Sequence, residues 1–310
     1  MIARALTAEA ITKRYGDLVA VDALSLTAAP GEVLAMVGPN GAGKTTTLDM
    51  LAGTTRPDSG EVRWQGRSIG PEQLRQLVGL SPQSTQLWPR LTCIEQLLYL
   101  ASLFGLSRTR GVEVAERLLD RVGLAAQRDT QARRLSGGMQ RRLNIALALV
   151  SDPDVVVLDE PEAGLDPQSR VLARELIVEL ATERVVIVTS HDLAEVERVA
   201  DRVIILDHGR AIAEGRPGDL LLSAQLAPAL EFTTTSGAAA GLAAALATVT
   251  GADRVQMDAG LVTVRLLPDG QLEALLSAAV RSGAALTAVQ TRDSSLEDLF
   301  LQLTGRSLRE

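Results

Sequence analysis

The chain has 310 residues, of which 46% are hydrophobic and 22% charged, a composition that can bury a core and excludes a largely disordered protein. The formal net charge of −7 argues against a general nucleic-acid binder, because such proteins need a basic surface. A single cysteine, Cys93, excludes an internal disulfide, and the absence of a Cys/His cluster excludes a typical zinc site, so a reducing cytosol fits.

The N-terminal sequence predicts no secretion signal, and no apolar run is long enough to predict a membrane-spanning helix. Short apolar runs at 32–38, 154–160 and 184–190 have the length and β-branching of strands that are buried on both faces. Such strands are typical of a parallel sheet covered by helices. Apolar residues at spacings of three and four predict helices over 92–106 and 111–124. Together these elements predict an α/β fold.

A hairpin is predicted over 201–215, with its turn at 207–209. The composition changes after it, and we place a domain boundary at about residue 225. Residues 226–310 alternate again between strand-like and helix-like runs and predict a small α+β domain. Its predicted strands are 230–235, 253–258, 261–267 and 286–292, and its predicted helices are 239–249, 271–283 and 295–305.

A glycine-rich loop lies between the first buried strand and a helical run over 45–53. It comprises Gly38, Pro39, Asn40, Gly41, Ala42, Gly43, Lys44, Thr45 and Thr46 and follows the pattern GxxxxGKT in its required setting. Its backbone N–H groups and the helix N-terminus can ring an anion, and Lys44 adds a charge for the β- and γ-phosphates. The Thr45 hydroxyl can ligate Mg²⁺. The alternative is a chance glycine-rich turn, and the motif alone indicates only a nucleoside triphosphate.

Polar residues follow two of the other buried strands. Asp159 and Glu160 end one strand, and His191 directly follows another. Ligands of open α/β sheets bind at such strand ends. We interpret Asp159 as a partner of the Mg²⁺ held by Thr45, and Glu160 as the group that polarises a water for attack on the γ-phosphate. The alternatives are a surface acidic pair and a structural histidine.

The stretch LSGGMQRRL, residues 135–143, places Gly137 and Gly138 at the start of a predicted helix, where packing alone gives no reason for two glycines. With this motif the chain resembles the nucleotide-binding subunit of an ABC transporter, over about residues 5–222. The resemblance rests on seven elements in the family's order: Tyr15, the phosphate loop, Gln83, residues 135–139, Asp159 with Glu160, Asp166 and His191.

The resemblance implies a P-loop NTPase cassette over 1–225, with a RecA-like core sheet, an antiparallel β subdomain and a helical subdomain at about 85–150. The small domain over 226–310 would have an accessory or dimerisation role. The cassette would pair head to tail with a second copy of itself or with a homologous ATPase subunit. Ser136, Gly137, Gly138 and Asp166 of one chain would then bind the ATP held by the phosphate loop of the other. Glycines at that helix start leave room for the approaching γ-phosphate.

Further roles follow from the resemblance alone. Tyr15 would stack on adenine, unless it is an ordinary core tyrosine. Gln83 would touch Mg²⁺ or the attacking water, and His191 would act beside the γ-phosphate. The segment 81–100 would form a groove for a helix of a membrane permease subunit, with Leu87 and Trp88 as exposed apolar candidates, although simple packing explains them equally well. The chain would then sit on the cytoplasmic face of the inner membrane, held peripherally by the permease.

Two positions depart from the family's common pattern. Glu162 stands where threonine is common, beside the implied dimer interface, and Met139 stands where glutamine is common. Met139, the run SLEDLFLQLTG and the small domain resemble the exporter-type subfamily, whose partner is a separate six-helix protein in drug-resistance and lipid- or polysaccharide-export systems. The predicted function is therefore an ATP-hydrolysing subunit that powers an exporter.

Other functional classes remain as alternatives. One is a soluble ABC ATPase that acts on ribosomes or on Fe–S assembly. The ribosomal type carries two cassettes, whereas this chain has one. A DNA-repair type would need a long coiled coil between Lys44 and Ser136, and no sustained heptads occur there. A regulatory binding module would be expected to lack a catalytic group, whereas Lys44, Asp159, Glu160 and His191 are all present.

Overall fold

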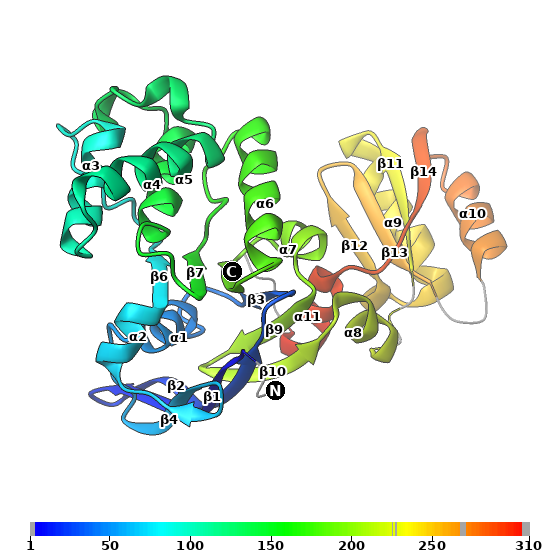
Figure 1. Ribbon diagram of the computed structural model, residues 1–310. Coiled ribbons are helices and arrows are strands. Elements are labelled where there is room, and N and C mark those ends of the chain that lie inside the picture. The colour runs from blue at the N-terminus through cyan, green and yellow to red at the C-terminus, as the bar shows by residue number, and fades with distance from the viewer. Residues whose placement is uncertain (1–3, 225, 227, 267–270, 306–310) are drawn as a thin grey trace. The chain divides into compact units, whose positions relative to one another are not determined.

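The computed structural model describes residues 4–224, 226, 228–266 and 271–305 (Figure 1). The chain divides into two compact units, one formed by Met1–Pro217 with Leu303–Glu310 and the other by Gly218–Gln302. Each unit contains its own sheet structure and its own apolar core. The predicted boundary, residue 225, and residue 267 at the end of a predicted strand lie outside the described residues.

The first unit is built on a six-stranded sheet in the order β10-β9-β3-β8-β7-β6. The strands are β3 (Val33–Val37), β6 (Val78–Ser81), β7 (Val155–Asp159), β8 (Val185–Ser190), β9 (Arg202–Asp207) and β10 (Arg210–Gly215). All are parallel to their neighbours except β10, which pairs antiparallel with β9. The three predicted strands and the predicted hairpin are confirmed. His208 and Gly209 form its turn with φ of 47° and 77°, the left-handed pair that a tight hairpin requires.

A second, antiparallel sheet in the order β2-β1-β4-β5 belongs to the same unit. Its strands are β1 (Leu6–Tyr15), β2 (Leu18–Ala28), β4 (Ser59–Trp64) and β5 (Arg67–Ser68). The apolar side chains of β1 and β2 pack in one core with those of β3, β7 and β8. The run of residues along these strands carried no strand prediction of its own, and the resemblance alone implied the sheet.

Helices cover the sheets of the first unit. They are α1 (Lys44–Leu51), α2 (Pro71–Leu77), α3 (Cys93–Leu103), α4 (Arg108–Arg121), α5 (Gly137–Ala148), α6 (Pro167–Ala181) and α7 (Leu193–Val199). The helices α3 and α4 confirm the two predicted by periodicity. Thr92 caps α3 through a reciprocal pair of hydrogen bonds with Glu95, which explains where that helix begins. Figure 1 shows α3, α4 and α5 gathered beside one another, and α5 carries the LSGG motif.

The second unit has an antiparallel sheet in the order β12-β13-β11-β14. Its elements are α8 (Pro217–Ser223), β11 (Ala229–Thr234), α9 (Ser236–Thr250), β12 (Val255–Asp258), β13 (Leu261–Arg265), α10 (Leu272–Arg281), β14 (Leu286–Arg292) and α11 (Leu296–Thr304). Phe232 of β11 is fully buried against side chains of α9, α10 and β13. The predicted alternation of strands and helices after residue 230 is confirmed within the described residues.

Candidate functional site

The phosphate loop has the tight geometry that its sequence predicts. Gly43 caps α1 with φ of 99°, and a Cβ atom there would lie 2.4 Å from the carbonyl oxygen of Ala20, so only glycine fits. This close approach of the Ala20 backbone also places the β1–β2 hairpin against the loop. The Lys44 Nζ atom donates hydrogen bonds to the carbonyls of Gly38, at 2.6 Å, and Pro39, at 3.0 Å. Burial lowers the pKa of Lys44, while the carboxylates of Glu160 and Asp159 act to raise it.

Asp159, at the end of β7, is held between two hydroxyl groups. Thr45 Oγ1 donates to Asp159 Oδ2 at 3.1 Å, which joins the start of α1 to the end of β7. The Thr189 hydroxyl of β8 donates to Asp159 Oδ1. The same hydroxyl accepts a hydrogen bond from the backbone N–H of Glu160, at 3.0 Å. Because the parallel strands β7 and β8 end at the same edge of the sheet, residues far apart in sequence meet here.

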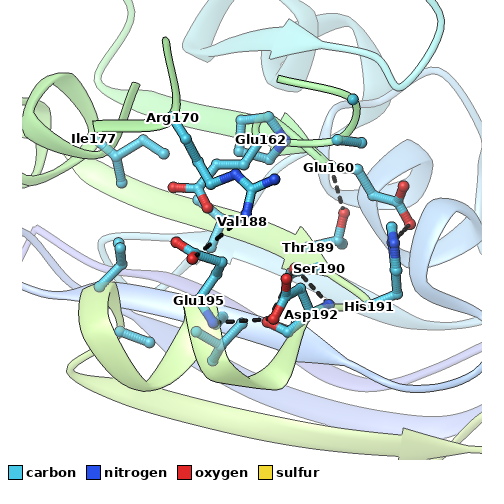
Figure 2. A pocket seen from close by; sticks show the side chains of 17 residues that line it. Glu160, Glu162, Arg170, Ile177, Val188, Thr189, Ser190, His191, Asp192 and Glu195 are labelled. Atoms are coloured by element: carbon cyan, nitrogen blue, oxygen red, sulfur yellow. Dashed lines mark hydrogen bonds and ion pairs between the residues drawn. The ribbon is translucent and has the colours of Figure 1, made fainter. Parts of the chain in front are cut away.

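Glu160 is the best-connected acid of the site. Its side chain is 8% exposed and accepts a hydrogen bond from Gln83 Nε2, at 2.9 Å, and its other oxygen lies 3.0 Å from His191 Nδ1. The backbone of Glu160 has φ of 49°, a left-handed conformation that costs a non-glycine residue about 1–3 kcal/mol and that is common at functional sites. Figure 2 shows Glu160 and His191 facing one another at a cavity of about 100 Å³.

The structure thus brings six of the predicted site residues together at one edge of the central sheet. They are Lys44, Thr45, Gln83, Asp159, Glu160 and His191. Tyr15 ends β1 on the hairpin that lies against the phosphate loop. Its ring is half exposed, with the Lys13 ammonium 5.7 Å from the ring centroid.

The remaining predicted residues form a second group at the starts of α5 and α6. Ser136 caps α5 by accepting a hydrogen bond from the backbone N–H of Met139. Asp166 caps α6 and accepts hydrogen bonds from the N–H and the hydroxyl of Ser169. A Cβ atom on Gly138 would lie 2.6 Å from the hydroxyl oxygen of that serine, whereas one on Gly137 would meet nothing within 4 Å. The two glycines therefore have different roles. Gly138 is needed for close packing within the chain, whereas Gly137 borders open space.

Two residues that organise the site were not predicted from the sequence. One is Thr189, whose only signal was its place in the strand that leads to His191. The other is Arg141 of α5, which is 4% exposed. Its guanidinium donates to backbone carbonyls of Pro82, Gln83, Asp159, Glu160 and Pro161. A charged residue three positions after Gly138 was a weak signal, because its partners come from two distant segments.

The ligands that Thr45, Asp159 and Gln83 offer are all oxygen atoms, which suits the hard cation Mg²⁺. Within the described residues, no cluster of three or more His, Cys, Asp or Glu side chains could hold a metal ion. Mg²⁺ is usually held by one or two protein oxygens together with substrate phosphates and waters, so this sparse oxygen set beside the phosphate loop fits it.

A strand, phosphate loop and helix, with acids and a histidine at the neighbouring strand ends, define an ATPase of the P-loop class. The chain belongs to the ABC transporter family: a model of the family described as "ABC transporter" matches residues 21–163. The Nod factor export ATP-binding protein I of Cupriavidus metallidurans is 38% identical over 97% of both chains. The protein of the same name from Rhizobium etli is 37% identical over 97% of this chain and 93% of its own.

Solved structures give the same family. The cbiO1 protein of Clostridium perfringens, part of an ABC transporter complex, has a TM-score of 0.65 and 28% identity over 71% of this chain and 91% of its own. A dimeric ATP-binding cassette bound to ADP and Pi has a TM-score of 0.62 and 25% identity over 68% of this chain and 98% of its own. The chain is therefore an ATP-binding and ATP-hydrolysing subunit of an ABC transporter, and ABC ATPases of this kind dimerise and work with membrane permease subunits. No described helix has the length and apolar character to cross a membrane.

The role of the Thr189 hydroxyl, which bonds both Asp159 and the backbone of Glu160, can be tested by substitution. Thr189→Val keeps the shape but leaves Asp159 Oδ1 and the Glu160 N–H without their partner in a buried place, so unfolding should become easier by about 1–3 kcal/mol. ATP turnover should also fall, because both acids lose a positioning contact. Denaturant unfolding and an ATPase assay measure the two effects. Thr189→Ser keeps the hydroxyl and is the control; equal losses in both variants would contradict this role.

Proposed function

We propose that this chain is the ATPase subunit of an exporter, with a drug, lipid or polysaccharide as cargo. The likeness to proteins named for Nod factor export supports export, because it runs over nearly the whole chain, including the second unit. The small domain over 226–310 then has an accessory or dimerisation role. The alternative is a soluble ABC ATPase without a transport role.

The observation that carries the catalytic proposal is the pair of contacts on Glu160. Gln83 and His191 hold the two oxygens of its carboxylate at 2.9 and 3.0 Å, and its charge acts on Lys44 of the phosphate loop. Glu160 takes a proton from water as the water oxygen forms a bond to the γ-phosphorus, and the bond from that phosphorus to the β–γ bridging oxygen breaks. His191 orients Glu160 and contacts the γ-phosphate, and Gln83 positions the water.

The phosphate loop, Gly38 to Thr46, binds the triphosphate through its N–H groups, and Lys44 exchanges its carbonyl partners for phosphate oxygens. Tyr15 stacks on the adenine, which its half-exposed ring permits. Thr45, Asp159 and Gln83 would hold Mg²⁺, which would neutralise charge on the β- and γ-phosphates.

A second copy of the chain completes each ATP site. Ser136, Gly137, Gly138 and Asp166 would contact the ATP held by the partner's phosphate loop. Two features support this arrangement: these residues sit at helix starts, where backbone N–H groups favour an anion, and the space around Gly137 is open. The homodimer is the simplest assembly that provides two such sites.

We expect Glu160→Gln to reduce ATP turnover by about 10²-fold or more, the scale of general-base catalysis. ATP binding should persist, and ATP-bound dimers should accumulate, because the amide keeps the shape and removes a charge that repels the γ-phosphate. Turnover, nucleotide affinity and size in solution measure these effects. Lys44→Ala provides the contrast, since it should lose ATP binding as well. Wild-type turnover in Glu160→Gln would sink the assignment.

The open space at Gly137 makes it possible to test the shared site without damaging the fold. Gly137→Asp should leave the isolated chain folded and able to bind ATP, because its own phosphate loop is intact. It should fail to dimerise with ATP, because a carboxylate and its bulk would stand where the partner's γ-phosphate approaches. Calorimetry and sedimentation measure both properties. Loss of ATP binding in the monomer would mean that the motif touches its own nucleotide.

The membrane partner should be a separate permease of the six-helix type, which would hold the chain at the cytoplasmic face of the inner membrane. Trp88 and Tyr99 support a docking surface for it on the segment 81–100. These residues are 41% and 47% exposed, and their rings stack edge to face with ring centroids 5.2 Å apart. Purification from membranes should recover such a protein with this chain, and Trp88→Ala should weaken the association. Recovery of ribosomal components instead would favour the soluble alternative.

A further inference from the structure

A pair of acidic side chains meets across the cavity beside Glu160 and His191. Glu162 comes from the turn after β7, and Glu195 comes from the first turn of α7. Both line the cavity (Figure 2), and a hydrogen bond between their carboxyl groups shifts the pKa of each. The Glu162 Oε1 atom is buried and accepts no hydrogen bond. A buried carboxylate oxygen without a donor is costly, whereas a protonated carboxyl group can donate to the carboxylate of its neighbour.

Arginines surround Glu195 rather than Glu162. Arg174 of α6 forms a hydrogen-bonded ion pair with Glu195 Oε2. Arg170 and Arg198 lie 3.7 and 3.5 Å from Glu195 Oε1. One acid of the pair is therefore held as a carboxylate by neighbouring cations, and the other is left to carry the proton.

The pKa values of the two acids diverge accordingly. Burial, the negative charge of Glu195 and the hydrogen bond to it raise the pKa of Glu162 to about 7, against the opposing effect of Arg174 and Arg170. Burial alone would raise the pKa of Glu195 as well, but the hydrogen bond and charge of Arg174, the hydrogen bond to Glu162 and the charge of Arg198 hold it below its ordinary value.

The acidic pair lies next to the catalytic contact in the chain. Glu195 is in the first turn of α7, where its N–H donates to the carboxylate of the cap residue Asp192, at 3.2 Å. His191 directly precedes that cap, and Glu160 is two residues before Glu162. The turn after β7 is thus joined to the start of α7 at two points, by the Glu160–His191 contact and by the Glu162–Glu195 pair.

We propose that Glu162 and Glu195 share one proton and that this carboxyl pair positions His191 against Glu160 during ATP hydrolysis. The inference rests on the catalytic roles proposed above for those two residues. Glu162 does not touch the reacting atoms in this scheme. It is a positioning residue, and it gives a function to the position at which the chain departs from the threonine common in its family.

Ionisation of Glu162 turns this attraction into repulsion. When the pH exceeds the raised pKa of Glu162, two carboxylates face one another. Their repulsion pushes the turn after β7 away from the start of α7. The remaining charged groups around the cavity are Arg170 and Arg174 from α6, Arg198 and Asp192 from α7, and Glu160 and His191 from the strand ends. Arg141 of α5 reaches the same turn through the carbonyl of Pro161. The arginines reduce this repulsion only in part, because they already form ion pairs with Glu195.

The test compares ATP turnover of the wild type with that of Glu162→Gln between pH 6 and 8.5. The glutamine amide donates to Glu195 at every pH, so it mimics the protonated acid. The ratio of wild-type to variant turnover should be near one at pH 6 and fall by about threefold or more by pH 8, with a midpoint near 7. Using the ratio cancels pH effects that are common to both proteins. Glu183→Gln, a change at an exposed glutamate after α6, is the matched control and should keep the wild-type profile.

A second measurement tests the shared proton itself. The pKa of Glu162 is higher in the folded chain than its ordinary value of 4.5, so the wild type should lose unfolding free energy relative to Glu162→Gln as the pH rises from about 4.5 to about 7. The Glu183→Gln control should show no such difference.

The outcomes separate the two proposals. A turnover ratio that does not change with pH overturns the positioning role. A difference in unfolding free energy between wild type and Glu162→Gln that does not change with pH overturns the shared proton. Glu160→Gln should show its loss of turnover, about 10²-fold or more, at every pH in this range whichever result is obtained. If Glu160→Gln remains active while the stability difference follows pH, the carboxyl pair exists and the catalytic assignment is wrong.

Discussion

The buried guanidinium of Arg141 is the constraint on which the rest of the site depends. A permanently charged group in the interior must have all its donors satisfied, and Arg141 satisfies them with backbone carbonyls of two segments: the stretch at Pro82 and Gln83, and the end of β7 from Asp159 to Pro161. Because Arg141 belongs to α5, the helix that begins with the LSGG motif is bound to both catalytic segments. A movement of that helix would therefore be transmitted to Gln83 and Glu160.

The second organising feature is the direction of the strands. The strands β3, β7 and β8 are parallel neighbours, so their carboxyl ends carry the phosphate loop, the two acids and the histidine to one edge of the sheet. Thr189 then joins β7 to β8 by bonding both Asp159 and the backbone of Glu160. The site contains a strained residue, Glu160, at the point where chemistry is proposed.

The cluster of charges around Glu195 shows how one substitution can be absorbed without loss of the fold. An extra acid at Glu162 would be expected to destabilise the turn after β7. The structure instead places it beside a carboxylate that three arginines already hold, where protonation lets the two acids attract one another. The same arrangement makes the turn sensitive to pH near neutrality, because the proton that joins the two acids is lost there.

The sequence by itself determined the elements whose signals are local. The phosphate loop, the buried strands at 32–38, 154–160 and 184–190, the hairpin at 201–215 and the second unit's alternation could all be predicted, because glycine patterns and apolar periods act over a few residues. The antiparallel sheet followed only from the resemblance. Its strand β1 pairs with β4, which lies far along the chain, and such a pairing leaves no local signal. Only the tertiary structure revealed Arg141, Thr189 and the Glu162–Glu195 pair. Their roles come from groups that lie far apart along the chain, and such contacts leave no pattern in the sequence around any one of them.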